Sequence, residues 1–458
     1  MLTIFDRPPH LCDGLSRRAI LKAGSLSALG LSASPGLAAT SSAPPAKAVI
    51  VLFLMGGPPQ HSTWDPKPAA PKEIRGEFGP IATNVPGIQI SELLSKTAAH
   101  ADKLAILRAV TTGDNAHSSS GYYMLTGVPH IPKQVENANP GAPNNHPSFG
   151  AVVQSLSRER RLLPPAISLP MRIFNTDGSV WPGQDSGFLG HAADPWLFHC
   201  EPGSKDFDVP QFRLGADVTL DRLSRRERLL DQVDQQVREI ERSGAPASFT
   251  ADQAQVFELL GSQKSRAACD LTLEADATRD RYGRGQFGQS VLLARRLVEA
   301  GVKFVHVNWF RAPDEPSTNP CWDSHNDEAN RLKNTLCPPA DQALSALLAD
   351  LTERGLLDDT IVAVLSEFGR SPKINHVAGR DHWGSVFSVA LAGGGIRGGQ
   401  VIGASDAVGG LPREGLVTPE DITATLFHQL GYNPQTEIHD PTGRPLPISR
   451  GRVIEALA

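Results

Sequence analysis

The chain has 458 residues, a net charge of −5 and 40% hydrophobic residues. This length suffices for one large α/β domain or two smaller ones. The mildly negative charge lacks the basic excess of a nucleic-acid-binding protein, and after the first forty residues no apolar run is long enough to span a bilayer.

The first residues have the pattern of a twin-arginine export signal. Arg17 and Arg18 precede a weakly apolar stretch, and the alanine pair ending at Ala39 offers a cleavage site. This pattern is typical of a removable signal that directs folded cargo to the twin-arginine export machinery. We therefore expect 1–39 to be a signal peptide, 40–47 to be a tether, and the mature protein to be periplasmic or extracellular.

Short apolar runs then alternate with helix-like segments. The run over 49–55 ends at a glycine pair and suits a strand buried on both faces of a parallel sheet. The other predicted strands cover 104–110, 302–309, 360–365 and 385–391. The predicted helices cover 93–104, 286–300, 341–354 and 418–431. This alternation predicts an α/β fold, a doubly wound and mostly parallel sheet flanked by helices.

One stretch, around 215–265, differs from the rest. It is dense in charged residues and glutamine, with leucines at helical spacing. Such a pattern indicates exposed helices whose charges form a solvated face. We expect a single α/β domain over 48–458 that carries this helical insertion.

Four of the five cysteines follow the predicted signal. None has the CxxC spacing of a zinc site. Cys321 and Cys337 are close in sequence and could pair in an oxidising compartment, and the sequence leaves open whether they do.

Histidines and acids follow four predicted strands. In an open parallel sheet, ligands bind beyond the carboxyl ends of the strands. Mixed imidazole and carboxylate ligands suit zinc, manganese or iron, whereas carboxylates alone suit magnesium or calcium. Any single pair could merely hydrogen-bond a loop, but four at one edge predict a functional site. The groups are His61 with Asp65, Asp114 with His117, Asp323 with His325, and Glu367 with Asp381 and His382.

Several long motifs resemble one bacterial family. They are GGPPQHSTWDPKP, HSSSGYYMLTG, SEFGRSPKIN and GRDHWGSVFSVALAGGG. Together they resemble the domain of unknown function 1501 family, which is grouped with the alkaline phosphatase and sulfatase superfamily. The resemblance covers nearly the whole mature chain. It implies an alkaline-phosphatase-like α/β domain with a two-metal site.

The resemblance also implies ligands for one or two divalent ions, expected to be zinc, manganese or calcium. Asp323, His325 and His382 would hold one ion, and Glu367 would bind the other. Two ions in such a site clamp the attacking and leaving oxygens of a phosphoryl or sulfuryl displacement. The further metal candidates are Asp381, beside His382, and either His61 or His117 to complete the second set.

The chain departs from the superfamily pattern at two positions. Gly56 stands where a metal-binding aspartate usually ends the first strand. The position of the catalytic nucleophile falls on His117, which would be a ligand or an unconventional phosphoryl acceptor. A slip of one residue would place Ser118 there, activated at a helix N-terminus. Ser118 could equally serve only as a helix cap.

The expected substrate is a small anionic ester or a sulfated or phosphorylated glycan. Arg370 and Lys373 could bind an anionic oxygen of it, or could be surface charges of a loop. Gln60 is a further substrate-binding candidate. The predicted activity is metal-dependent ester hydrolysis. The alternative is a non-catalytic binding or scaffold protein on the same fold, for polysaccharide or a surface partner.

Overall fold

The computed structural model describes 46–157, 163–204, 207, 262–310, 315 and 320–457. The predicted signal peptide and most of the predicted helical insertion lie outside these residues. The last two residues of the predicted tether belong to the fold. The backbone N–H of Ala46 donates to the carbonyl of Gln429, and that of Lys47 donates to the carbonyl of Asp359, each at 2.7 Å.

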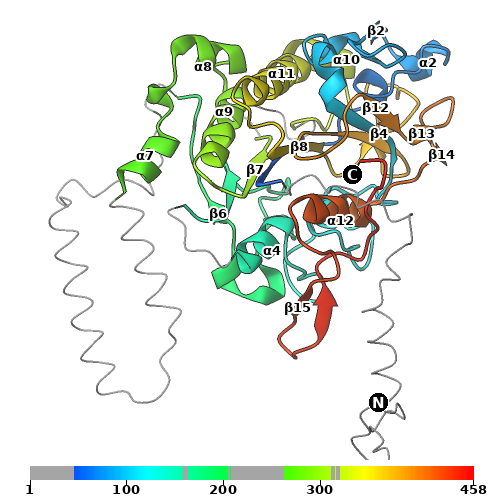
Figure 1. Cartoon of the computed structure of the whole chain (residues 1–458). Coiled ribbons are helices and arrows are strands. Elements are labelled where there is room, and N and C mark those ends of the chain that lie inside the picture. Colours follow the sequence, from blue (N-terminus) through cyan, green and yellow to red (C-terminus); the bar gives the residue numbers. More distant parts are fainter. Residues whose placement is uncertain are drawn as a thin grey trace, which may run out of the picture. The chain divides into compact units, whose positions relative to one another are not determined.

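An eight-stranded sheet forms the core (Figure 1). In spatial order its strands are β12 (Gln400–Ile402), β4 (Leu104–Val110), β11 (Phe387–Ala392), β8 (Thr360–Leu365), β1 (Ala48–Phe53), β7 (Phe304–Asn308), β5 (Ala166–Leu169) and β6 (Trp196–Leu197). Strand β11 is antiparallel to both of its neighbours, and the other pairings are parallel. The predicted, mostly parallel sheet is confirmed.

The central position of β1 follows from its sequence. All six of its residues are buried, as expected of an apolar, β-branched strand that is covered on both faces. It lies between β7 and β8, and Phe53 is in register with both Asn308 and Leu365. Because these three strands are parallel, the segments that follow them emerge at one edge of the sheet.

Helices cover both faces of the sheet (Figure 1). On one face lie α8 (Asp276–Tyr282), α9 (Gln286–Glu299) and α11 (Cys337–Glu353), and on the other lie α4 (Phe149–Leu156) and α12 (Pro419–Gln429). The remaining α-helices are α2 (Lys72–Arg75), α3 (His117–Thr126), α7 (Gln263–Cys269) and α10 (Glu328–Arg331). None of the helices in the described ranges combines the length and apolarity needed to cross a membrane.

Short elements complete the domain. Two-stranded sheets pair β2 (Pro80–Ala82) with β3 (Gln89–Ser91), β9 (Gly369–Arg370) with β10 (His382–Trp383), β13 (Ala404–Ser405) with β14 (Pro412–Glu414), and β15 (Glu437–His439) with β16 (Pro445–Pro447). Single 3₁₀ turns lie at Gln60–Ser62, Glu92–Leu94, Gly187–Leu189, His191–Ala193 and Leu271–Leu273, a longer 3₁₀ helix covers Thr97–Lys103, and a π-helical turn covers Leu332–Leu336.

The helix predicted over 93–104 is wrong in one respect. The structure divides this segment into two 3₁₀ helices, because the carboxylate of Asp341 accepts the backbone N–H groups of Lys96 and Thr97 at 2.9 and 2.8 Å. The helix predicted over 418–431 is confirmed as α12, with a capping box between Thr418 and Asp421.

The cysteines of the described ranges form no disulfide. Cys321 and Cys337, the pair that the sequence left open, are both buried thiols. Burial raises the pKa of the Cys337 thiol. Both side chains therefore contribute to packing in this structure.

Candidate metal centre

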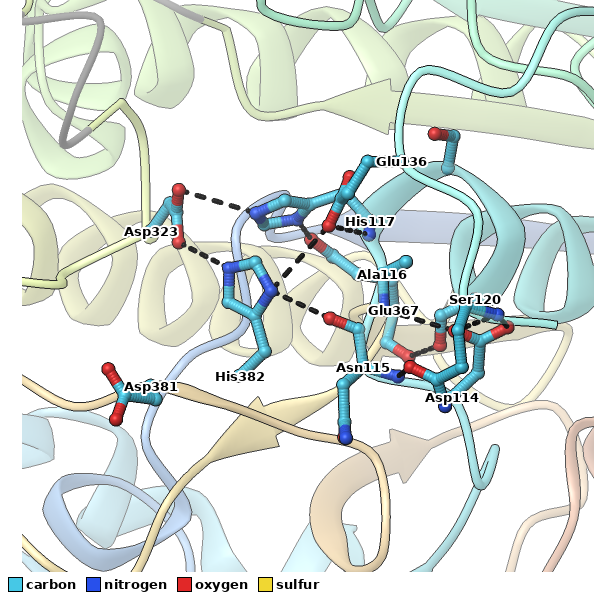
Figure 2. A network of polar contacts seen from close by, with 12 residues as sticks. Asp114, Asn115, Ala116, His117, Ser120, Glu136, Asp323, Glu367, Asp381 and His382 are labelled. Carbon is cyan, nitrogen blue, oxygen red and sulfur yellow. Dashed lines mark hydrogen bonds and ion pairs between the residues drawn. The ribbon is translucent and has the colours of Figure 1, made fainter.

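Histidines and acids from separate segments meet at the edge of the sheet beyond β1, β7 and β8 (Figure 2). His117 is the first residue of α3, and Asp323 lies on the chain that follows β7. Glu367 comes two residues after β8, and His382 opens β10. The common direction of parallel strands, which predicted convergence at this edge, accounts for His117, Asp323 and Glu367, whereas His382 reaches the centre through the antiparallel pairing of β10 with β9.

Asp323, His325 and His382 form a tight group, and His117 also lies close enough to Asp323 and His382 for those three to hold a metal ion. Oδ1 of Asp323 lies 3.0 Å from Nε2 of His325 and 3.0 Å from Nε2 of His382. The two imidazole nitrogens lie 2.9 Å apart. Ligands around one ion with bonds of about 2.0–2.2 Å are separated by similar distances. These three atoms therefore have the spacing of a set that shares a cation.

The tautomer of His382 also supports its assignment to the set of side chains that could share a cation. Its Nδ1 lies 2.7 Å from the backbone carbonyl of Asn115. A carbonyl only accepts, so Nδ1 carries the proton. Burial lowers the pKa of His382 to about 3, so the ring is neutral and Nε2 presents a lone pair. This lone pair faces the carboxylate oxygen of Asp323, and a cation between the two would make the approach favourable.

Arg370 holds the carboxylate of Asp323 in place. Its side chain is fully buried, and it donates to Asp323 and to the backbone carbonyls of Gly56, Gly57 and Arg380. Although burial opposes ionisation, Arg370 and His117 hold the pKa of Asp323 well below its usual range. The prediction that Arg370 binds a substrate oxygen is wrong in this structure, because the guanidinium is enclosed and its donors are engaged.

His117 stands between two carboxylates. Its Nδ1 lies 2.7 Å from Oε1 of Glu367, and its Nε2 lies 3.3 Å from Oδ2 of Asp323. Burial disfavours the charged ring, but the two carboxylates outweigh burial and raise the pKa of His117 to about 10. Glu367 is itself fully buried and accepts the N–H of Gly56 at 2.8 Å.

The unusual Gly56 at the end of β1 has a steric explanation. Its φ is +112°, a region that favours glycine. A Cβ at this position would lie 2.3 Å from the backbone nitrogen of Asp323. The close approach that brings Asp323 into the centre therefore leaves no room for an aspartate on the first strand.

The serines after His117 hold a loop. The Oγ of Ser118 accepts the backbone N–H of Ala138 at 3.0 Å and faces the carbonyl of Val135 at 3.4 Å, and the side chain is fully buried. The structure thus contradicts the prediction of Ser118 as nucleophile, because its hydroxyl is engaged away from the acids. The helix-cap alternative is also wrong, since Ala116 is the N-cap residue.

Replacing Ser118 by alanine tests this assignment. We expect the free energy of unfolding to fall by about 1–3 kcal/mol, because the N–H of Ala138 loses its buried acceptor. We expect the rate of any ester hydrolysis per folded molecule to change less than about twofold, whereas loss of a nucleophile costs about a thousandfold or more. Ser119→Ala is the matched control, since the Oγ of Ser119 also accepts from this loop, at the N–H of Val135.

Three other predicted residues lie outside the tight group. His61 is buried with Nε2 2.8 Å from the carbonyl of Val408, and burial together with Arg380 lowers its pKa to about 3. The amide of Gln60 is bonded to the backbone of Arg370 in both directions, so it braces β9 and is not placed to bind substrate. Lys373 is exposed in the loop after β9.

Asp381 lies on the outer side of His325. Its Oδ1 is 3.6 Å from Nδ1 of His325, the nitrogen that faces away from Asp323, and Figure 2 shows Asp381 apart from His117 and His382. At this distance the carboxylate can pair electrostatically with the imidazole, but 3.6 Å is too long for the hydrogen bond that usually orients a ligating ring. The structure therefore gives Asp381 a supporting position, not one within the tight group that was predicted to include it.

A cavity of about 360 Å³ opens beside the group. His117, Asp323 and His382 line it together with the aromatic side chains of Phe174 and Trp181. The indole Nε1 of Trp181 is buried without a hydrogen-bond partner among the described residues. Beyond these residues the lining contains Met55, Gly56, Glu136, Asn137, Asn175, Thr176 and Pro320.

Two residues at the centre were not predicted. Glu136 accepts the backbone N–H of His117 at 2.9 Å and lines the cavity, and burial raises its pKa. Asn115 supplies the carbonyl that orients His382. Glu136 lies in a Pro- and Asn-rich stretch without a recognisable motif, so the sequence offered no signal for it. The role of Asn115 depends on its backbone, which the residue type does not reveal.

Solved structures resemble the chain distantly. A PsFucS1 sulfatase from Pseudoalteromonas sp. is 14% identical, with a TM-score of 0.38, over 90% of this chain and 70% of the other. A phosphonate monoester hydrolase of Agrobacterium radiobacter is 11% identical, with a TM-score of 0.41, over 90% and 77%. A TAB5 alkaline phosphatase mutant is 12% identical, with a TM-score of 0.34, over 85% and 99%. Such distant likenesses transfer neither residues nor activity.

No curated protein matches the chain. A family model described as "Protein of unknown function (DUF1501)" matches residues 46–458, which include the whole range 48–458 predicted as the domain and the last two residues of the predicted tether. The match agrees with the resemblance carried by the motifs around Gln60, His117, Glu367 and His382. The chain belongs to the DUF1501 family.

Proposed function

We propose that the chain is an exported, metal-dependent hydrolase of anionic esters, either phosphates or sulfates. The observation that carries the proposal is the group formed by Asp323, His325 and His382, whose ligand atoms lie about 3 Å apart beside a cavity. Cavities that combine apolar walls with a few convergent polar groups are the usual form of a small-molecule site.

The donor set favours some ions over others. Two imidazole nitrogens and a carboxylate oxygen suit zinc, manganese or iron, whereas calcium prefers oxygen ligands throughout. We therefore expect zinc or manganese to bind this group in preference to calcium. When bound, the ion would polarise the ester and lower the pKa of the attacking water.

The chain's own residues would prepare the site for an ester. Asn115 fixes the tautomer of His382, and Arg370 fixes Asp323, so both ligands are oriented in advance. The aromatic rings of Phe174 and Trp181 offer apolar contact to the organic part of a substrate. No lysine or arginine occurs among the described residues that line the cavity, so the negative charge of an ester would be met at the metal side.

The export part of the proposal rests on Arg17 and Arg18, which lie outside the described residues. We expect a variant with lysine at both positions to stay in the cytoplasmic fraction, while the unchanged chain reaches the periplasm. The measurement is cell fractionation followed by immunodetection. Equal export of both forms would contradict the twin-arginine route.

Turnover assays test the activity. The full chain, stripped with a chelator and then supplied with zinc, manganese, magnesium or calcium, is offered 4-nitrophenyl phosphate, 4-nitrophenyl sulfate, and phosphorylated or sulfated sugars. We expect hydrolysis of at least one ester with zinc or manganese, and its loss on renewed chelation. His382→Ala should remove it, because one of the three ligands is lost. Absence of turnover with every ion and ester would exclude the hydrolase.

One observation favours a second candidate function. Ser118 and Ser120 both engage their hydroxyls in the fold, Ser120 with the carbonyl of Glu367 at 2.6 Å. The predicted nucleophile position thus lacks a hydroxyl facing the acids. A metal-assisted binding protein for anionic glycans fits this feature as well. Metal-dependent retention of a sulfated or phosphorylated glycan without its cleavage would establish binding in place of catalysis.

A further inference from the structure

We infer that the centre holds a single metal ion, and that the ring of His117 fills the place that a second ion would take between Asp323 and Glu367. The inference rests on the metal centre of the proposed function and is independent of ester hydrolysis. It departs from the two-metal site that the resemblance to the superfamily implies.

The two oxygens of Asp323 face different partners. Oδ1 is shared by His325 and His382 at 3.0 Å each, and this is the side on which three donors converge. Oδ2 faces Nε2 of His117 at 3.3 Å. On the far side of the same ring, Nδ1 lies 2.7 Å from Glu367. The imidazole thus spans the gap between two carboxylates, and a cation bridging them would need the volume that the ring occupies.

The space between Asp323 and Glu367 also has too few ligand atoms for a second ion. Both oxygens of Glu367 are engaged, Oε1 by the N–H of Gly56 and Oε2 by the hydroxyl of Ser366, each at 2.8 Å. Gly56 cannot carry a carboxylate, because even a Cβ would lie 2.3 Å from the backbone of Asp323. The hydroxyl of Ser118 is bound to Ala138 instead of facing the acids. Divalent ions in all-protein sites generally need three or more protein ligands, and the described side chains supply fewer on this side.

Neighbouring rings hold His117 in place. Its centroid lies 4.8 Å from that of Phe368, 4.3 Å from that of His382 in an edge contact, and 6.0 Å from that of Trp181. Its backbone N–H is bonded to Glu136 at 2.9 Å. A ring packed on several sides and bonded at both nitrogens is part of the wall of the centre. It does not need to swing aside for the ion held by His325 and His382.

Metal stoichiometry tests the inference without any substrate. The full chain is stripped with a chelator, reconstituted with zinc or cobalt, freed of excess ion and submitted to elemental analysis. We expect one ion per chain, and none after His325→Ala or His382→Ala. His117→Ala should keep one ion with an affinity within about threefold and an unchanged cobalt absorption spectrum, because the three ligands remain. His61→Ala is the matched control for loss of a buried histidine and should also keep one ion.

A variant designed to bind a second ion tests the claim that the ring of His117 fills the place of that ion. His117→Asp removes the ring and adds a third carboxylate between Asp323 and Glu367, so we expect the stoichiometry to rise to two ions. Circular dichroism and thermal unfolding confirm that each variant is folded. Two ions in the unchanged protein, loss of the ion in folded His117→Ala or His61→Ala, or a single ion in folded His117→Asp would each overturn the inference. If no ion bound to the unchanged protein, the proposed metal centre would also be wrong. If one ion bound but no ester were hydrolysed, only the proposed hydrolase activity would be overturned.

Discussion

Asp323→Asn is expected to weaken metal binding at least about a hundredfold. Its Oδ1 touches both His325 and His382 at 3.0 Å, so this carboxylate is the charged member of the group. Loss of a residue that only orients a ligand already costs about 10–100-fold in affinity, and loss of a ligand should cost more. Asparagine keeps the shape of the side chain, which isolates the effect of the charge. The dissociation constant is measured by competition with a chelator of known affinity.

Two aspartates serve as matched controls for Asp323→Asn. Asp381→Asn should weaken binding by less than about tenfold, below the usual cost of losing an orienting residue, because this side chain is 68% exposed and its 3.6 Å distance from the outer nitrogen of His325 is too long for a hydrogen bond. Asp276→Asn, at an exposed ion pair with Arg284 on α8, should leave the affinity unchanged. If Asp381→Asn cost more than Asp323→Asn, the ligand set would have to be redrawn around His325 and Asp381.

Asp323→Asn also leaves Arg370 buried next to a neutral partner. Removal of one member of a buried pair costs about 3–5 kcal/mol of stability, part of which the other acceptors of Arg370 will offset. Binding is therefore measured well below the melting temperature of the variant. Normal metal binding by a folded Asp323→Asn protein would contradict the assignment of this carboxylate as a ligand.

The sequence predicted the convergence of Asp323, His325, Glu367 and His382 because each follows a strand-like run. The direction of parallel strands, combined with the position of each residue just after a strand, is enough to place a side chain at one edge of a sheet. The same local reasoning predicted the mostly parallel sheet, and it identified α12 through its N-cap threonine. These features depend on the periodicity and capping of a few neighbouring residues, which a single sequence contains.

The roles of Arg370 and Ser118 depended on information that the sequence does not contain. Arg370 looks like a loop cation after Glu367, yet its acceptors include the carbonyls of Gly56 and Gly57, more than 300 positions away. Ser118 differs from His117 by one position, and one residue turns a side chain about 100° around a helix. Which of the two faces the acids is decided by the loop at Val135 to Ala138, whose path no motif encodes.

Gly56 occupies a position where the superfamily usually has an aspartate, and the structure gives a steric reason for the glycine. From the sequence, glycine at this position is only an absence of a ligand. In the structure, the strand end and the backbone of Asp323 approach so closely that a Cβ would lie 2.3 Å from the nitrogen. The glycine therefore permits the close approach of the backbone of Asp323 to the end of β1 and excludes a carboxylate from this position.

Arg370→Leu is expected to lower the free energy of unfolding by about 3–5 kcal/mol. The guanidinium is fully buried and paired with Asp323, so its removal leaves a buried carboxylate and several carbonyls without a donor. Arg370→Lys keeps the charge but loses the planar fork, and each acceptor left unpaired costs about 1–3 kcal/mol. Chemical denaturation of the metal-free protein measures these changes. Arg413→Leu, at an exposed pair with Glu414, is the matched control and should shift stability by less than about 0.5 kcal/mol.

Adding metal distinguishes a role of Arg370 in holding Asp323 from a role in binding substrate. An ion that binds only the native state stabilises it by an amount that grows with the logarithm of its concentration divided by its dissociation constant, and it also compensates the charge of Asp323 that Arg370→Leu leaves unpaired. Zinc should therefore raise the melting temperature of Arg370→Leu more than that of the unchanged protein. A residue that only bound a substrate oxygen would leave the unfolding of the substrate-free protein unaltered. If Arg370→Leu unfolded like the unchanged chain, both with and without zinc, then Asp323 would not depend on this arginine and its placement in the centre would need another cause.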